Sequence, residues 1–176
     1  MKNKPSEKIV ERRIAVVGAK GVGKTSLIQS FSYEMKVKSK DEQVDEYQVD
    51  LYYNDNNVIY SLLISDPQHD QGEIDQYVKN FDAQIFVFAY DDEESFNKVQ
   101  EIFEEMIARR VPMLPRVVVG NKSNMQPFAM NVDGHEAHNY VRTRMRCEYF
   151  DCNVTDEQSV DDVFYTIIDL IEEYQE

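Results

Sequence analysis

The chain has 176 residues, of which 42% are hydrophobic and 30% charged, and its formal net charge at pH 7 is −14. Such a chain suits one globular domain that buries roughly 70% of the surface its unfolded form exposes. No apolar run approaches the ~20 residues that cross a bilayer, and the negative charge repels nucleic acid, so the composition excludes a membrane-spanning chain and argues against a nucleic-acid-binding one.

The two cysteines are too few for a disulfide framework in a chain of this length, so we expect a reducing compartment and a cytoplasmic protein. The start of the chain lacks the apolar core of a signal peptide and the glycine used for myristoylation, and its end lacks a prenylation cysteine. We therefore expect no membrane anchor, and either a monomer or one domain of a larger protein.

The first predicted elements are a strand, a loop and a helix. A polar leader over residues 1–12 precedes a short apolar strand over residues 14–17. The stretch GAKGVGKTS follows over residues 18–26, and apolar residues then recur at helical spacing. This stretch fits the pattern G-x-x-x-x-G-K-[ST], in which backbone N–H groups surround a phosphate and the lysine adds positive charge. The motif predicts a nucleotide site and is shared by kinases, ATPases, GTPases and inactive relatives of each.

The next part of the chain predicts a loop, a hairpin and a buried strand. Residues 31–44 are charged and lack an apolar period, which indicates a mobile loop. Two β-rich runs over residues 47–53 and 58–64 flank the turn residues NDNN, so they predict an antiparallel hairpin. The apolar run over residues 83–90 predicts a strand that is buried on both faces.

The remaining elements alternate between helix and strand. Apolar residues share one helical face from Glu93 onward, and a buried strand follows over residues 116–121. A helix over residues 135–146, a strand over residues 148–151 and a last helix capped by Ser159 complete the chain. The alternation predicts an α/β fold with a six-stranded, mostly parallel sheet, one antiparallel edge strand and five helices. Its ligand is expected at the carboxyl ends of the strands.

The order of these motifs resembles that of Ras-like small GTPases. A glycine loop, a hairpin, Asp66 at a strand end and GNKSN at a later strand end follow one another as in that family, and the resemblance covers residues 13–176. It implies a P-loop G domain that binds GTP or GDP with Mg²⁺. Thr25 and Asp66 would hold the Mg²⁺ ion, a hard cation that prefers oxygen ligands. The residues implied at the nucleotide are Gly18, Lys20, Gly21, Val22, Gly23, Lys24, Thr25, Ser26, Asn121, Lys122, Asn124, Asn153 and Val154.

The residues that family members use for hydrolysis are altered. No threonine occurs in the segment before the hairpin, where the family uses one to sense Mg²⁺ and the terminal phosphate, and His69 replaces a glycine after Asp66. Asp70 stands where a glutamine orients the attacking water, and Lys20 replaces a small loop residue. The catalytic residue is unassigned among three candidates, Gln68, Asp70 and Gln71. These changes predict slow or absent hydrolysis.

The residues that read the base are altered too. Asn124 stands where the family has an aspartate that accepts two hydrogen bonds from guanine. Losing one charge-assisted bond weakens affinity about ten- to a hundredfold and loosens discrimination between bases. The turn Asn153, Val154, Thr155 replaces a serine, alanine and lysine turn, so only its backbone contacts are expected to persist.

An intact phosphate loop with altered switch residues also resembles the Rad and Gem group and the GTPase-like domain of centaurin-gamma proteins. We therefore expect a guanine-nucleotide-binding regulatory domain with weak or absent hydrolysis. Regulatory or effector proteins would bind through the segments from Lys36 to Glu46 and from Asp66 to Tyr77. Three alternatives remain open: an active GTPase switch with non-standard catalytic residues, a small-molecule kinase and a nucleotide-free scaffold.

Overall fold

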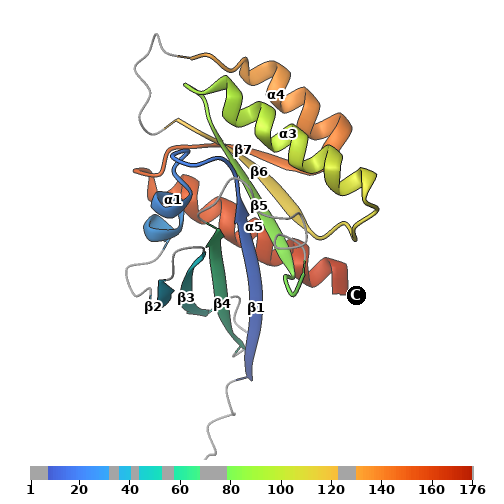
Figure 1. Cartoon of the computed structure of the whole chain (residues 1–176). Helices are drawn as coiled ribbons and strands as arrows, with labels where there is room; N and C mark the ends of the chain where they lie inside the picture. Colours follow the sequence, from blue (N-terminus) through green and yellow to red (C-terminus); the bar gives the residue numbers. More distant parts are fainter. Residues whose placement is uncertain are drawn as a thin grey trace, which may run out of the picture.

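The computed structural model describes residues 8–31, 36–40, 44–52, 58–67, 79–122 and 130–175, with the backbone alone for residues 36–40, 44, 66 and 67. These residues form a central sheet with helices on both faces (Figure 1). The strands are β1 (Lys8–Val17), β2 (Lys36–Lys40), β3 (Val44–Tyr52), β4 (Val58–Pro67), β5 (Ala83–Ala89), β6 (Arg116–Asn121) and β7 (Glu148–Cys152). The helices are α1 (Lys24–Phe31), α3 (Glu93–Ala108), α4 (Gly134–Tyr140), its π-helical continuation η1 (Val141–Met145) and α5 (Glu157–Gln175).

The predicted α/β fold with a mostly parallel sheet is confirmed. The strands lie in the order β2-β3-β4-β1-β5-β6-β7, and all neighbours from β4 to β7 are parallel. β3 pairs antiparallel with β4 from Val44↔Pro67 to Tyr52↔Ile59, which confirms the predicted hairpin. Because β1, β4, β5, β6 and β7 run in one direction, their carboxyl ends meet at one edge of the sheet, where α/β proteins bind ligands.

The sheet has seven strands where six were predicted. β2 forms within the segment predicted as a loop and pairs antiparallel with β3, so β3 lies one place in from the edge rather than at it. The sequence of β2 has lysines at alternate positions, which is typical of an edge strand but gives no apolar period. The described residues contain four α-helices, one fewer than predicted.

β1 begins at Lys8, within the residues predicted as a polar leader. Its backbone pairs with β4 from Lys8↔Val58 onward, but only its last four residues, Ile14 to Val17, are buried. The apolar pattern therefore marks the buried half of the strand alone, because the first half is held mainly by pairing with the backbone of β4, and Val10 packs only partly against the core.

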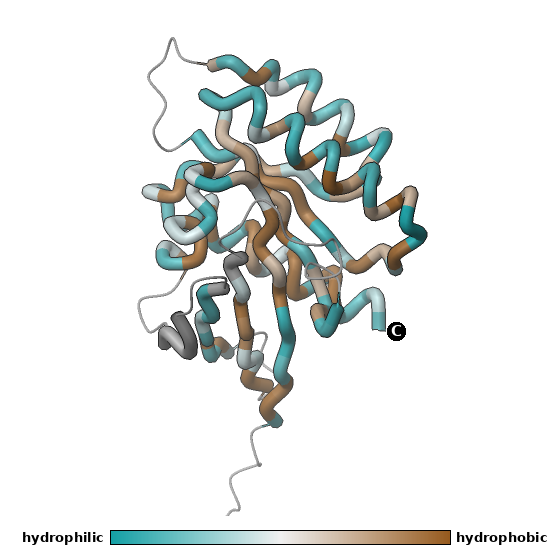
Figure 2. Tube along the Cα trace, in the orientation of Figure 1, coloured by the Kyte–Doolittle hydropathy of each residue, from teal (hydrophilic) through white to brown (hydrophobic). Residues whose placement is uncertain are grey.

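Two apolar layers enclose the sheet. One layer packs side chains of α1 and α5 against the strands, and the other packs α3 and α4 on the opposite face. All seven residues of β5 are buried, as predicted for a strand covered on both faces. Figure 2 shows apolar residues along these central strands.

The last helix begins at Glu157, so Ser159 lies in its first turn and is not its cap as predicted. The Ser159 hydroxyl lies 3.0 Å from the carbonyl oxygen of Asn153 and 2.9 Å from that of Asp156. Serine hydroxyls readily bond to nearby backbone in this way. These contacts fix the turn between β7 and α5 against the helix.

Candidate functional site

The glycine loop connects β1 to α1 at the carboxyl edge of the sheet. Gly21 and Gly23 have φ values of +83° and +99°, which residues with a Cβ rarely adopt. A Cβ on Gly18 would lie 2.2 Å from the carbonyl oxygen of Val87, so the loop passes directly against β5. Each of these three positions therefore requires glycine for a local physical reason.

Lys24 turns its charge back over this loop. It is the first residue of α1 and only 8% of its surface is exposed. Its Nζ donates to the carbonyl oxygens of Gly18 and Ala19, both at 2.9 Å. A cation is thus fixed at a loop whose next element is a helix N-terminus, where free backbone N–H groups favour anions. This combination suits a phosphate group.

Asn121 ties the end of β6 to the same loop. Its Nδ2 donates to the carbonyl oxygen of Val22 at 2.8 Å, and 7% of its surface is exposed. A Cβ on Gly23 would lie 2.3 Å from that Nδ2. The predicted phosphate loop and the predicted base motif, 99 residues apart in sequence, are therefore in direct contact.

Lys122 follows Asn121 but contacts a different set of residues. Its Nζ lies 2.8 Å from Oδ2 of Asp151 and 4.8 Å from the centre of the Tyr90 ring. Tyr90 donates to Oδ1 of Asp151 at 2.5 Å, and its hydroxyl also bonds to that of Tyr149. The sequence analysis missed Tyr90, Tyr149 and Asp151, although Tyr90 and Asp151 lie at the carboxyl ends of strands that flank β6.

At neutral pH the carboxyl group of this cluster is charged and its two phenols are neutral. Burial raises the pKa of Asp151, but hydrogen bonds from Lys122, Tyr90 and Tyr149 outweigh it and hold the pKa below its usual value. Burial and the neighbouring carboxylate raise the pKa of Tyr90, and burial with the bond to Tyr90 raises the pKa of Tyr149. The cluster is thus one cation, one anion and two neutral phenols.

The Asn153 side chain hydrogen-bonds to Thr155 within the turn that follows β7. Oδ1 of Asn153 accepts hydrogen bonds from the Thr155 backbone N–H at 3.1 Å and from its hydroxyl at 2.8 Å. Val154 packs against the apolar layer that contains α1 and α5. The Asn153 amide oxygen is therefore engaged in its own turn.

The remaining predicted site residues are placed only in part. Val22 is buried, Thr25 is half-buried, and Lys20 and Ser26 are exposed. Asp66 lies next to last in β4, at the carboxyl edge of the sheet, with its backbone alone described. The catalytic candidates Gln68, Asp70 and Gln71 and the base residue Asn124 lie outside the described residues, as do positions 41–43 and 68–77 of the two predicted partner segments.

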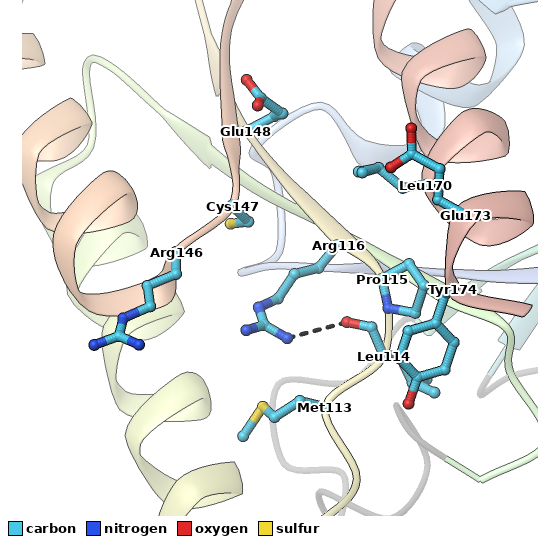
Figure 3. A pocket seen from close by; sticks show the side chains of 10 residues that line it. All are labelled: Met113, Leu114, Pro115, Arg116, Arg146, Cys147, Glu148, Leu170, Glu173 and Tyr174. Carbon is cyan, nitrogen blue, oxygen red and sulfur yellow. Dashed lines mark hydrogen bonds between the residues drawn. The ribbon is translucent and has the colours of Figure 1, made fainter. Parts of the chain in front are cut away.

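A cavity lies at the opposite edge of the sheet, away from the glycine loop. It has a volume of about 410 Å³ and is lined by the first residues of β6 and β7 and by the end of α5. Figure 3 shows Arg116 at its centre, donating to the carbonyl oxygen of Leu114, with Cys147 beside it. Burial raises the pKa of the Cys147 thiol to about 11.

We expect Cys147 to react slowly with thiol reagents in the native protein. A thiol reacts as its thiolate, so at pH 8 a pKa of about 11 lowers its rate with Ellman's reagent on the order of a hundredfold relative to free cysteine. The rate should rise as the pH approaches 11. Cys147→Ser, which leaves the fully buried Cys152, identifies the signal, and both thiols should react in denaturant. Rapid native labelling at pH 8 would contradict the raised pKa.

No helix within the described part of the chain is long and apolar enough to cross a membrane. In a comparison with known protein families, the sequence model of the Ras family matches residues 13–173. The chain is also similar to Ras-related protein ralB-B and Ras-related protein ralB-A of Xenopus laevis. Each is 26% identical over 171 residues, which cover 95% of this chain and 82% of the relative.

Proposed function

The chain belongs to the Ras family of small GTPases, and from this membership we propose that it binds guanine nucleotide with Mg²⁺ at the glycine loop. We propose further that it hydrolyses GTP slowly or not at all and works as a regulatory domain through protein partners.

The observation that carries the nucleotide proposal is the contact between two distant motifs. Lys24 is held over the loop by two carbonyl oxygens, and Asn121 is hydrogen-bonded to the same loop from the end of β6. This contact holds the end of β6 beside the loop, which supports a ligand that reaches from the loop to the residues at the end of β6. The positive φ values at Gly21 and Gly23 give the loop a backbone conformation of the kind in which successive N–H groups can surround a phosphate, which supports the proposal.

Thr25 and Asp66 would serve a Mg²⁺ ion that neutralises phosphate charge when bound. Thr25 lies in the first turn of α1, directly after Lys24, and Asp66 lies at the carboxyl end of β4. Both positions are on the edge of the sheet that carries the loop. A hydroxyl and a carboxylate are oxygen ligands of the kind that this ion prefers.

The proposal of slow hydrolysis rests on the sequence. Asp70 brings a carboxylate to the position of the water-orienting glutamine, where it would lie close to phosphate charge. Lys20 places a long side chain in the loop, and its side chain is exposed. We therefore expect the protein to bind GTP but to hydrolyse it slowly. The GTP-bound state then persists, and the protein acts through contact with its partners.

Partner binding would use the two segments from Lys36 to Glu46 and from Asp66 to Tyr77. The first includes β2, which is the edge strand of the sheet, and the first residues of β3. An edge position gives a partner access to backbone groups as well as side chains.

The test is to denature the purified protein with heat, identify any released nucleotide by chromatography, and titrate the emptied protein with GDP, GTP, ATP and XTP in Mg²⁺. We expect guanine nucleotide to be released or preferred, and a melting temperature that rises with its concentration. Single-turnover hydrolysis of GTP should be slow. A fast turnover that falls when Gln68 is replaced would favour an active switch, and a melting temperature that no nucleotide changes would favour a scaffold.

A further inference from the structure

We infer that Asp151 is a positioning residue for the base: its carboxylate, oriented by Tyr90 and Tyr149, holds the Lys122 side chain at the base-binding end of β6. This inference rests on the proposed function, because it concerns how the nucleotide base is held.

Asn121 and Lys122 are neighbours in sequence but serve opposite sides of the sheet. Successive side chains of a strand point to opposite faces. Asn121 reaches the glycine loop on the side of α1, whereas Lys122 reaches the layer of α3 and α4, to which Tyr90 and Tyr149 belong. A flexible lysine placed this way adopts one position only if something holds its ammonium group.

The carboxylate of Asp151 is itself fixed in orientation. Its Oδ1 lies 2.5 Å from the hydroxyl of Tyr90 and 3.2 Å from that of Tyr149, and the two hydroxyls bond to each other. This leaves Oδ2 for the Lys122 ammonium at 2.8 Å. The phenols therefore hold the carboxylate in the orientation that presents an oxygen to the lysine.

The space for both phenols comes from Gly120. A Cβ at Gly120 would lie 2.6 Å from Cε2 of Tyr90 and 2.7 Å from the hydroxyl of Tyr149. Tyr90 is only 1% exposed, and Phe88 packs against its ring at 5.3 Å between centroids. The ring of Tyr90 is thus a rigid surface, and the Lys122 ammonium lies over it at 4.8 Å in a cation–π contact.

Lys122 has room to leave this position when the carboxylate is removed. A pocket of about 450 Å³ adjoins Lys122 and Asp151 and extends to Gly134 and His138 of α4. Since the side chains of Lys122 and Asp151 are 33% and 50% exposed, water competes with their ion pair. The restraint that Asp151 provides is therefore modest and shows as a few-fold change in binding rather than a loss.

The experiment measures the release of a fluorescent GDP analogue from the full chain in Mg²⁺. Asp151→Asn should release it about two- to fivefold faster than the wild type. This change corresponds to the free energy that one partly exposed ion pair contributes. Tyr90→Phe, which keeps the ring but removes the hydroxyl, should change release in the same direction by less. Glu104→Gln is the matched control, because it breaks the partly exposed pair with Arg144 on α3 and η1, and release should not change.

A double-mutant cycle separates positioning from a general structural effect. Lys122→Met keeps the aliphatic stem and removes the ammonium, so Asp151→Asn added to Lys122→Met should cause no further acceleration. If Asp151→Asn accelerates release equally in both backgrounds, or not at all, the inference is overturned while nucleotide binding stands. If the wild type binds no guanine nucleotide, the proposed function fails and the inference fails with it.

Discussion

Gly23→Ala is expected to lower the free energy of unfolding by about 2 to 5 kcal/mol and to weaken nucleotide binding. The backbone at Gly23 has a φ of +99°, which strains a residue with a side chain by about 1 to 3 kcal/mol. The added Cβ would also meet Nδ2 of Asn121 at 2.3 Å, so the buried hydrogen bond from Asn121 to Val22 must lengthen or break. Urea unfolding monitored by circular dichroism measures the change.

Gly21→Ala is the control for this prediction. Gly21 has a φ of +83°, but no heavy atom lies within 4 Å of a Cβ there. It should therefore show the backbone strain alone, and its unfolding free energy should fall less than that of Gly23→Ala. Equal losses for the two variants would mean that the contact between the loop and Asn121 contributes nothing to stability.

Lys24→Met is expected to weaken the binding of Mg²⁺-GDP by about a hundredfold or more, because hydrogen bonds to a charged group each contribute about 1.5 to 3 kcal/mol. The methionine keeps an unbranched side chain in the buried space but removes the cation that two carbonyl oxygens hold over the loop. The fold should persist, since the apolar layers are untouched. Titration calorimetry measures the affinity, and circular dichroism checks the fold.

Lys98→Met on the surface of α3 controls for the loss of one positive charge. Lys98 is paired with Glu101 of the same helix at 3.7 Å and belongs to an element that does not form the loop. Its affinity for the nucleotide should match that of the wild type. If Lys24→Met binds Mg²⁺-GDP as tightly as Lys98→Met, the glycine loop is not the phosphate site.

Elements that bury an apolar face were predictable from sequence, and elements held by backbone pairing were not. β5 is buried along its whole length and α3 has one apolar face, so both give a strong periodic signal. β2 and the first half of β1 are held by their partners β3 and β4. Backbone hydrogen bonds carry no residue pattern, so these two segments were assigned to a loop and a leader.

The candidate site divides in the same way. The glycine loop and the place of Lys24 at the start of a helix were predictable, because the motif fixes particular residue types at a fixed spacing within one short stretch. The contact of Asn121 with Val22 and the cluster around Lys122 were not predictable. They depend on parallel registers such as Ala89↔Asn121 and Gly120↔Asp151, which bring three strand ends into one row.

By itself, the sequence determined that this chain is an α/β protein with a glycine loop after its first strand, since local spacing and apolar period encode both. The tertiary structure alone decided which residues meet at the carboxyl edge of the sheet. It joined Asn121 to the loop and gave Lys122 its partners Asp151 and Tyr90. The physical reason is that strand register is set by pairing and packing over the whole sheet, and no single stretch of residues contains it.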